Sequence, residues 1–213
     1  SMFSSASSLS AEDRVWMDRA FVLAEQALQA DEVPVGCVFV YEGMEIGSGR
    51  NRVNQTHDPT RHAEMVALEF MESSRNDISE ILPSTSLYVT LEPCIMCAAA
   101  LYNIGVGRIV YGADNERFGG MRSVGNAQRY RAKPETVEVS TGYITSSSQF
   151  SCSFSCLVYL NPFQVVAGVD CDRSIRLLKA FYDKQNPFAP DDKRKVKKAK
   201  IEEKSEEKEK EEK

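Results

Sequence analysis

The chain has 213 residues, of which 42% are hydrophobic, and its formal net charge is −5. This length suits one domain of ordinary size with additional tails. No run approaches the roughly 20 consecutive apolar residues that a bilayer-spanning helix needs, so we expect no membrane-spanning segment here. The N-terminal stretch SMFSSASSLS lacks a basic segment followed by an apolar one, so we expect no secretory signal.

Six cysteines are present, and they are not evenly spaced along the chain. In a protein without a secretory signal we expect reduced thiols and a cytoplasmic and/or nuclear location. In that setting a close pair of cysteines more often binds a metal than forms a disulfide.

The first half of the chain predicts two helices separated by two strands. Ser10 can cap the first helix, with Asp13 three residues further on, and apolar residues from Val15 onward recur at helical spacing until Pro34. The predicted elements are a helix ending near Pro34, a buried strand over residues 35–41, an antiparallel strand over 45–54 and a helix over 61–73.

The second half continues this alternation. The predicted elements are a strand over residues 86–92, a helix that begins at Pro93, a strand over 108–113, the glycine-rich loop NERFGGMRSVG, a fifth strand over 135–144 and an amphipathic helix over 170–186. Strands that alternate with helices indicate the α/β class. We expect a three-layer α/β/α sandwich with a mixed five-stranded sheet.

A Pro-Cys-x-x-Cys motif lies at one predicted strand-to-helix junction. Cys94 and Cys97 are three residues apart, so they share one helical face in the first turn, where the helix dipole stabilises thiolates. His62 opens another helix and supplies a nitrogen. Three protein ligands leave the fourth position of a tetrahedral zinc ion for water, which is typical of catalytic rather than structural sites.

Glu64 follows His62 by two residues and therefore does not lie on the same helical stripe. Zinc lowers the pKa of bound water to about 7, and a neighbouring carboxylate can carry the released proton. This arrangement predicts hydrolytic attack on an electrophilic carbon. The pattern H-x-E…P-C-x-x-C is the signature of the zinc-dependent nucleobase deaminases.

Each motif has a simpler explanation when it is taken alone. A His-Ala-Glu triplet is usually incidental, and a Cys-x-x-Cys pair can serve zinc, redox chemistry or neither. A structural zinc site would need a fourth ligand, for which Cys37 and His57 are candidates. Cys37 lies within an apolar strand and His57 in a loop. The two motifs together, each opening a helix, favour catalytic zinc.

The resemblance extends beyond these motifs. EVPVGCVFV, GRNRVNQTHDPTRHAEMVAL, LYVTLEPCIMCAAAL and VYGADNERFGG together resemble the tRNA adenosine deaminases, over roughly residues 12–144 and 168–190. Generic cytidine deaminases share the zinc motifs but not NERFGG or the N…HDPT run. The resemblance implies a cytidine-deaminase-like fold, conversion of adenosine to inosine at the wobble position of tRNA anticodons, and a heterodimer with a related, catalytically silent subunit.

The resemblance also assigns roles to residues. Asn51 aligns with the residue that hydrogen-bonds the flipped base, and Val35 and Pro93 would belong to the substrate pocket. The silent subunits lack the glutamate, so the presence of Glu64 implies that this chain is the active partner. One Zn²⁺ ion would be held by His62, Cys94 and Cys97, with Glu64 as the proton carrier.

Contacts to RNA are expected from two segments. Arg117 and Phe118 of NERFGG could touch RNA or help to close the site, although the glycines there could simply permit a tight turn. The basic block near the C-terminus could clamp phosphates, direct nuclear import or be a solvated tail. The residues concerned are Lys193, Arg194, Lys195, Lys197 and Lys198.

The resulting domain prediction has three parts. Residues 1–10 form a flexible N-terminus, residues 11–190 form the deaminase domain, and residues 191–213 form a charged, disordered tail. Residues 145–167 depart from the family pattern, and we interpret them as an insertion with a short strand at 156–160. The alternative functions are deamination of another base or nucleoside, such as cytidine or guanine, and a non-catalytic zinc scaffold that presents tRNA.

Overall fold

The computed structural model describes residues 9–125 and 164–183. Five strands form one sheet in the order β2-β1-β3-β4-β5. β1 pairs antiparallel with β2 and β3, whereas β4 is parallel to β3 and β5 is parallel to β4. The sheet is therefore mixed, as predicted. The strands are β1 (Gly36–Tyr41), β2 (Met44–Arg50), β3 (Ser86–Leu91), β4 (Arg108–Ala113) and β5 (Gln164–Val166).

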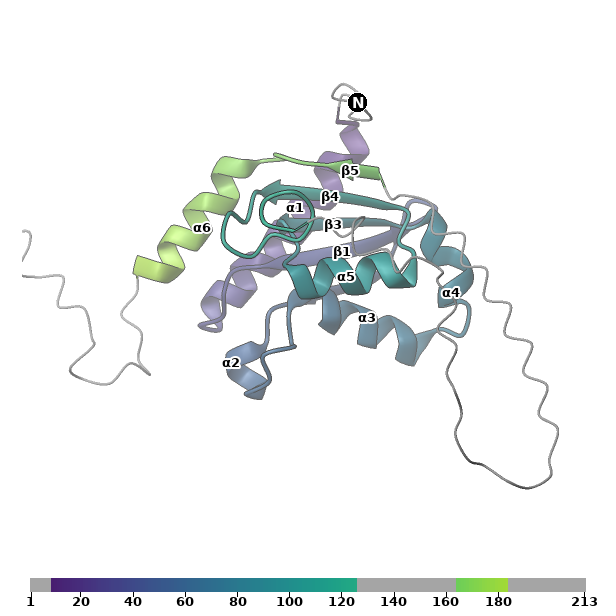
Figure 1. Cartoon of the computed structure of the whole chain (residues 1–213), viewed down its shortest axis with the longest axis horizontal. Coiled ribbons are helices and arrows are strands. Elements are labelled where there is room, and N and C mark those ends of the chain that lie inside the picture. The colour runs from purple at the N-terminus through teal and green to yellow at the C-terminus, as the bar shows by residue number, and fades with distance from the viewer. Residues whose placement is uncertain (1–8, 126–163, 184–213) are drawn as a thin grey trace, which may run out of the picture.

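Helices cover both faces of the sheet (Figure 1). Alternate residues of β1 point to opposite faces: Phe39 joins the apolar cluster under α3 and α5, and Val38 joins the cluster under α1. The three-layer α/β/α prediction is confirmed. The helices are α1 (Ala11–Gln29), α2 (Val53–Thr56), α3 (Ala63–Ser74), α4 (Ile78–Ile81), α5 (Ile95–Ile104) and α6 (Cys171–Asp183), with a short 3₁₀ helix η1 (Leu82–Ser84) after α4.

β2, α5 and β5 differ from the sequence prediction. β2 ends at Arg50 rather than at residue 54, because the chain turns there toward the start of α3. α5 begins at Ile95, so Pro93 precedes the helix instead of opening it. β5 lies at residues 164–166, inside the segment interpreted as an insertion. The strands predicted at 135–144 and 156–160 lie outside the described residues.

The buried side of α1 also differs from the expected one. The hydrophobic spacing places Val15 on the apolar face, but 62% of its surface is exposed. Asp13 and Met17 are buried in its place. The hydrophobic spacing alone assigned the wrong side at the start of the helix, because the buried position there is taken by a charged residue with partners on the sheet.

Asp13 ties α1 to two strands. Its carboxylate accepts the Ser10 N–H at 3.1 Å while the Ser10 hydroxyl accepts the Asp13 N–H at 3.0 Å, so the predicted capping box is present. The same carboxylate accepts hydrogen bonds from Tyr88 Oη at 2.8 Å and from Arg108 Nη1 at 2.6 Å. The Arg108 guanidinium holds the pKa of Asp13 well below its usual value, against the effect of burial.

None of the described helices is long and apolar enough to cross a membrane.

The Asp13 network predicts a stability loss that depends on pH. Replacing Asp13 by Asn removes charge-assisted hydrogen bonds and should lower the free energy of unfolding at pH 6 by about 2 kcal/mol. An unfolded aspartate has a pKa of about 3.9, and the native pKa is lower. The stabilisation is therefore complete above pH 5 and is lost as the pH falls toward the native pKa.

Urea unfolding of the Asp13→Asn variant and of the unmodified chain at pH 6 and pH 3 measures this effect. The difference between their free energies of unfolding should be about 1 kcal/mol smaller at pH 3 than at pH 6. Asp18→Asn is the matched control, because Asp18 lies on the same helix in an ion pair with Arg173 but its side chain is 66% exposed. A difference in the free energy of unfolding between Asp13→Asn and the unmodified chain that is the same at both pH values would contradict the prediction.

Candidate active site

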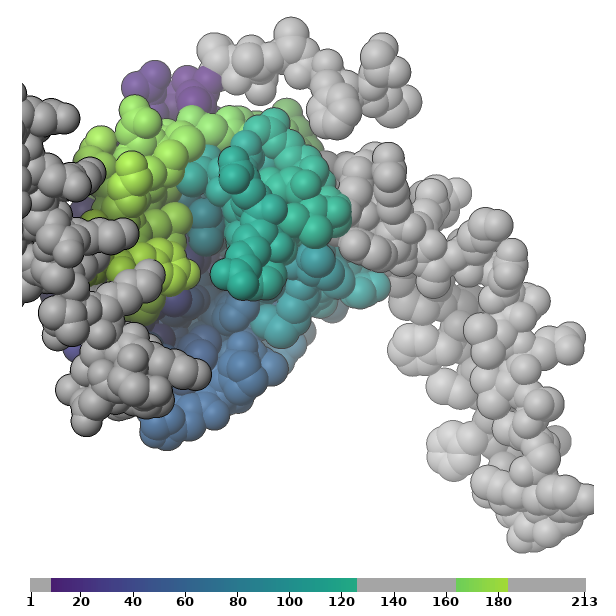
Figure 2. Space-filling view, turned by 60° about the vertical axis from the view of Figure 1, so that its left-hand side comes forward, coloured from purple at the N-terminus to yellow at the C-terminus, as the bar shows by residue number. Residues whose placement is uncertain are grey.

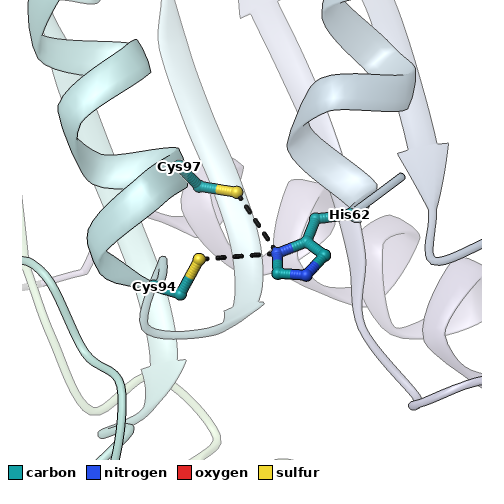
Figure 3. Close-up of side chains that lie close together, drawn as sticks. All are labelled: His62, Cys94 and Cys97. Carbon is teal, nitrogen blue, oxygen red and sulfur yellow. Dashed lines mark hydrogen bonds between the residues drawn. The ribbon is translucent and has the colours of Figure 1, made fainter. Parts of the chain in front are cut away.

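His62, Cys94 and Cys97 meet between the starts of α3 and α5 (Figure 3). His62 Nδ1 lies 3.4 Å from Cys94 Sγ and 3.5 Å from Cys97 Sγ. The three potential donor atoms all lie within 4.8 Å of one another. Residues 32 and 35 positions apart in the sequence thus form one compact cluster.

Two of these residues occupy the N-cap positions of their helices. His62 precedes α3 and Cys94 precedes α5, both with extended backbone, and neither side chain caps its own helix. The imidazole and the thiol are therefore free to point at each other. Because the positive ends of two helix dipoles face the cluster, thiolates are favoured there.

Other groups satisfy the first N–H of each helix. The Ala63 N–H donates to Asn51 Oδ1 at 2.9 Å, and the Ile95 N–H donates to the Phe118 carbonyl at 2.9 Å. Asn51 is only 6% exposed, and its own N–H donates to the Val35 carbonyl. The sequence assigned Asn51 to the base alone and missed this role at the start of α3.

The donor set suits zinc. The Cys97 thiol and the His62 imidazole, through hydrogen bonds to Cys94, lower the pKa of Cys94 to about 4. The hydrogen bond between Cys94 and Cys97, together with burial, raises the pKa of the Cys97 thiol. The hydrogen bond between Cys94 and His62 raises the pKa of the imidazole. Cysteine ligates a metal as the thiolate, so a divalent cation that binds here would displace the remaining thiol proton. Two thiolates and one imidazole nitrogen are the ligands that Zn²⁺ prefers.

Glu64 lies in the first turn of α3, with 3% of its surface exposed. Burial raises the pKa of its carboxyl group, and the nearby Cys97 thiol opposes this effect. A buried carboxyl group with a raised pKa beside a metal cluster can both accept and donate a proton. This position agrees with the expected proton carrier.

The two candidates for a fourth protein ligand lie apart from the cluster. Cys37 is fully buried in β1 and belongs to the apolar core, and burial raises the pKa of its thiol. His57 caps the C-terminal end of α2 with a left-handed backbone, φ 55°. Among the described residues, the metal-binding group contains three side chains, so the site is open rather than closed.

The loop after β4 lies beside the start of α5. The Phe118 side chain is 55% exposed, and the Arg117 guanidinium carbon lies 5.1 Å from the centre of its ring. Figure 2 shows the teal part of the chain that contains this segment at the surface, to the right of α6. The sequence singled out both residues. The basic residues from Lys193 to Lys198 lie outside the described part of the chain.

The glycines of this loop do not fit the alternative of a tight turn that needs a positive φ. Neither Gly119 nor Gly120 has a positive φ. A Cβ on Gly119 would lie 2.3 Å from the Glu92 carboxylate, and one on Gly120 would lie 2.6 Å from Ala98 Cβ. Glycine is needed here because the loop packs directly on its neighbours.

Sequence reasoning missed Glu92, the residue before Pro93. It is 1% exposed, and its carboxylate accepts hydrogen bonds from the loop after β4. Burial raises its pKa, but the hydrogen bonds from the Ser123 hydroxyl and from loop N–H groups outweigh burial and hold the pKa below its usual value. A charged residue at the end of a buried strand was the available signal.

The fold and the three-ligand cluster define a zinc-binding deaminase. Residues 10–113 match the cytidine and deoxycytidylate deaminase zinc-binding region. The guanine deaminase of Nitrosomonas europaea shares the fold, with a TM-score of 0.57 at 21% identity over 81% of this chain and 85% of that one. The chain is therefore an enzyme of the zinc-dependent hydrolytic deaminase class.

Closer relatives narrow the family. The tRNA-specific adenosine deaminase 2 of Danio rerio is 42% identical over 84% of this chain and 74% of that protein, and its Xenopus tropicalis counterpart is 38% identical over 82% and 91%. A structure from a study of A-to-I editing by tRNA:A34 deaminases matches with a TM-score of 0.57 at 30% identity, over 77% of this chain and 99% of that one. The chain belongs to the tRNA-specific adenosine deaminases.

The open three-ligand cluster predicts one zinc ion per chain. Replacing His62 by Ala or Cys97 by Ser should abolish stoichiometric zinc, because each change removes one of three donors. Cys37→Ala should retain one zinc per chain, since Cys37 lies in the core. Metal analysis after gel filtration with a weak chelator measures this. Loss of zinc from Cys37→Ala, or its retention in both ligand variants, would contradict the assignment.

Proposed function

We propose that this deaminase converts adenosine to inosine at the wobble position of tRNA anticodons. The observation that carries the proposal is the buried Glu64 beside the His62–Cys94–Cys97 cluster. The substrate comes from the relatives, which are named tRNA-specific adenosine deaminases. The match to a guanine deaminase, at 21% identity, concerns the fold and gives no reason to choose a free base as substrate.

The chemistry exchanges an amino group for oxygen at C6 of the base. A zinc ion held by the three side chains would act as a Lewis acid that activates water near neutral pH. Glu64 accepts a proton from the attacking water at a carboxylate oxygen and delivers it to N1 of the adenine. The carboxylate then takes the second proton from the hydroxyl group newly formed on C6 and passes it to the amino group, which leaves as ammonia while the C6 carbonyl of inosine forms. The balance is adenosine plus water to inosine plus ammonia.

Asn51 serves both the protein and the base in this proposal. Its Oδ1 accepts the Ala63 N–H, which fixes the orientation of the amide. Its Nδ2 group then faces the other way and is available to donate a hydrogen bond to a ring acceptor of the flipped adenine. The backbone N–H of Asn51 holds it against Val35, next to the pocket wall to which Val35 and Pro93 would belong.

We further infer tRNA and a second subunit as partners. Phe118 could stack on an unpaired base, and Arg117 and the basic block of Lys193, Arg194, Lys195, Lys197 and Lys198 could contact phosphates. The subunit would be a related, catalytically silent deaminase that forms a heterodimer with this chain. A cytoplasmic and/or nuclear location follows from a tRNA substrate.

Replacing Glu64 by Ala should abolish deamination while leaving the metal in place. Loss of a general acid–base group lowers the rate by up to about 10⁴-fold, and we expect at least 10³-fold. Inosine formation is measured on an unmodified tRNA transcript, with cytidine and guanine tested beside it. The assay is run with and without a related silent subunit.

The zinc content and tRNA affinity of Glu64→Ala serve as controls and should match those of the unmodified chain. Undiminished inosine formation by the variant would overturn the catalytic assignment. Activity on cytidine or guanine but not on tRNA would overturn the substrate. Full activity of this chain by itself would overturn the heterodimer.

Two substitutions separate the roles of Asn51. Asn51→Asp keeps an oxygen acceptor for the Ala63 N–H but removes the amide donor, whereas Asn51→Ala removes both. We expect both variants to lose about 10²-fold or more in kcat/KM. Only Asn51→Ala should also lower the unfolding midpoint, because it leaves the α3 N-terminus uncapped. Equal kcat/KM for Asn51→Asp and the unmodified chain would contradict a contact with the base.

A further inference from the structure

The Glu92 carboxylate accepts hydrogen bonds from N–H groups of a loop that lies far from it in sequence. Its Oε1 atom accepts the N–H groups of Met121 at 3.1 Å, Arg122 at 2.8 Å and Ser123 at 3.1 Å. Its Oε2 atom accepts the Asn115 N–H at 2.9 Å and the Ser123 hydroxyl. A single buried carboxylate therefore orders both ends of the loop.

The ordered loop is joined to the segment that carries Cys94. The Phe118 carbonyl accepts the Ile95 N–H at 2.9 Å, and the Gly120 N–H donates to the Pro93 carbonyl at 2.9 Å. Cys94 and Gly119 form an isolated antiparallel bridge. Every residue of the junction from 93 to 95 thus makes a backbone contact with the loop that Glu92 holds.

Glu32 provides a comparison within the same chain. It is also fully buried, and its carboxylate accepts the N–H groups of Asn54 at 3.1 Å and Gln55 at 2.8 Å. It orders the start of α2. These two hydrogen bonds do not reach α5. The two glutamates are thus similar in burial and bonding but differ in whether they support a cysteine of the cluster.

We propose that Glu92 is a positioning residue for the metal site and that it holds Cys94 in place through the loop at residues 115–123. The chain of contacts runs from the carboxylate to the loop N–H groups, from Phe118 and Gly120 to the 93–95 junction, and so to the thiolate. The inference rests on the zinc site of the proposed function. It concerns retention of the metal and not the choice of substrate.

The experiment measures zinc release from the intact chain into excess chromogenic chelator. Glu92→Gln keeps the size of the side chain but sets amide hydrogens against loop N–H donors. We expect release about tenfold faster than from the unmodified chain, as for other groups that support metal ligands indirectly. Glu32→Gln is the matched control and should change the rate by less than twofold, whatever its effect on the unfolding midpoint.

A second variant keeps the inference testable if Glu92→Gln does not fold. Gly120→Ala leaves the carboxylate intact but places a Cβ 2.9 Å from the Cys94 carbonyl, so it should also accelerate release. Unchanged release from both variants, or equal acceleration by Glu32→Gln, would overturn the inference. If the unmodified chain binds no zinc, the proposed function fails; if it binds zinc and Glu92→Gln releases it normally, the inference alone fails.

Discussion

The site depends on α3 and α5, whose N-termini lie next to each other and are not capped by their own N-cap side chains. An α-helix has N–H groups in its first turn that need acceptors, and the N-cap side chain normally supplies one. Here His62 and Cys94 occupy the N-cap positions, and neither side chain accepts such a bond. The side chains that would stabilise the helices are committed to the cluster, so acceptors must come from elsewhere.

Two neighbouring segments meet this requirement. Asn51 Oδ1 accepts the Ala63 N–H, which is made possible by the close packing of α3 on β2, where a Cβ on Gly49 would lie 2.3 Å from the Ala63 carbonyl. The Phe118 carbonyl accepts the Ile95 N–H from a loop that is itself held by Glu92. Polar acceptors are thus needed around the cluster because His62 and Cys94 occupy the N-cap positions of their helices.

The sequence predicted the parts of the site that depend on local signals. Cys94 and Cys97 are three residues apart at a strand-to-helix junction, and His62 and Glu64 open a helix, so their motif could be recognised directly. The three layers and the mixed sheet followed from the alternation of elements, whereas the order of the strands did not. The remaining features depend on segments that only folding brings together.

Glu92 shows why those features escaped prediction. Its donors lie 23 to 31 residues further along the chain, and they reach it because β4 runs parallel to β3 and brings its following loop to the same edge of the sheet. The need for glycine at position 119 could not be predicted for the same reason, since its neighbour is this carboxylate. β5 was missed because three residues are too short for a recognisable pattern.

The environment of Glu64 bears on the choice between a catalyst and a scaffold. A carboxyl group that is 3% exposed costs free energy of folding, and its burial raises the pKa. The zinc cluster does not need it, because three other side chains supply the ligands. A scaffold would gain stability by replacing Glu64 with an apolar residue. A buried acid beside an open metal site, kept despite its cost, is what proton transfer requires, and this favours the catalyst.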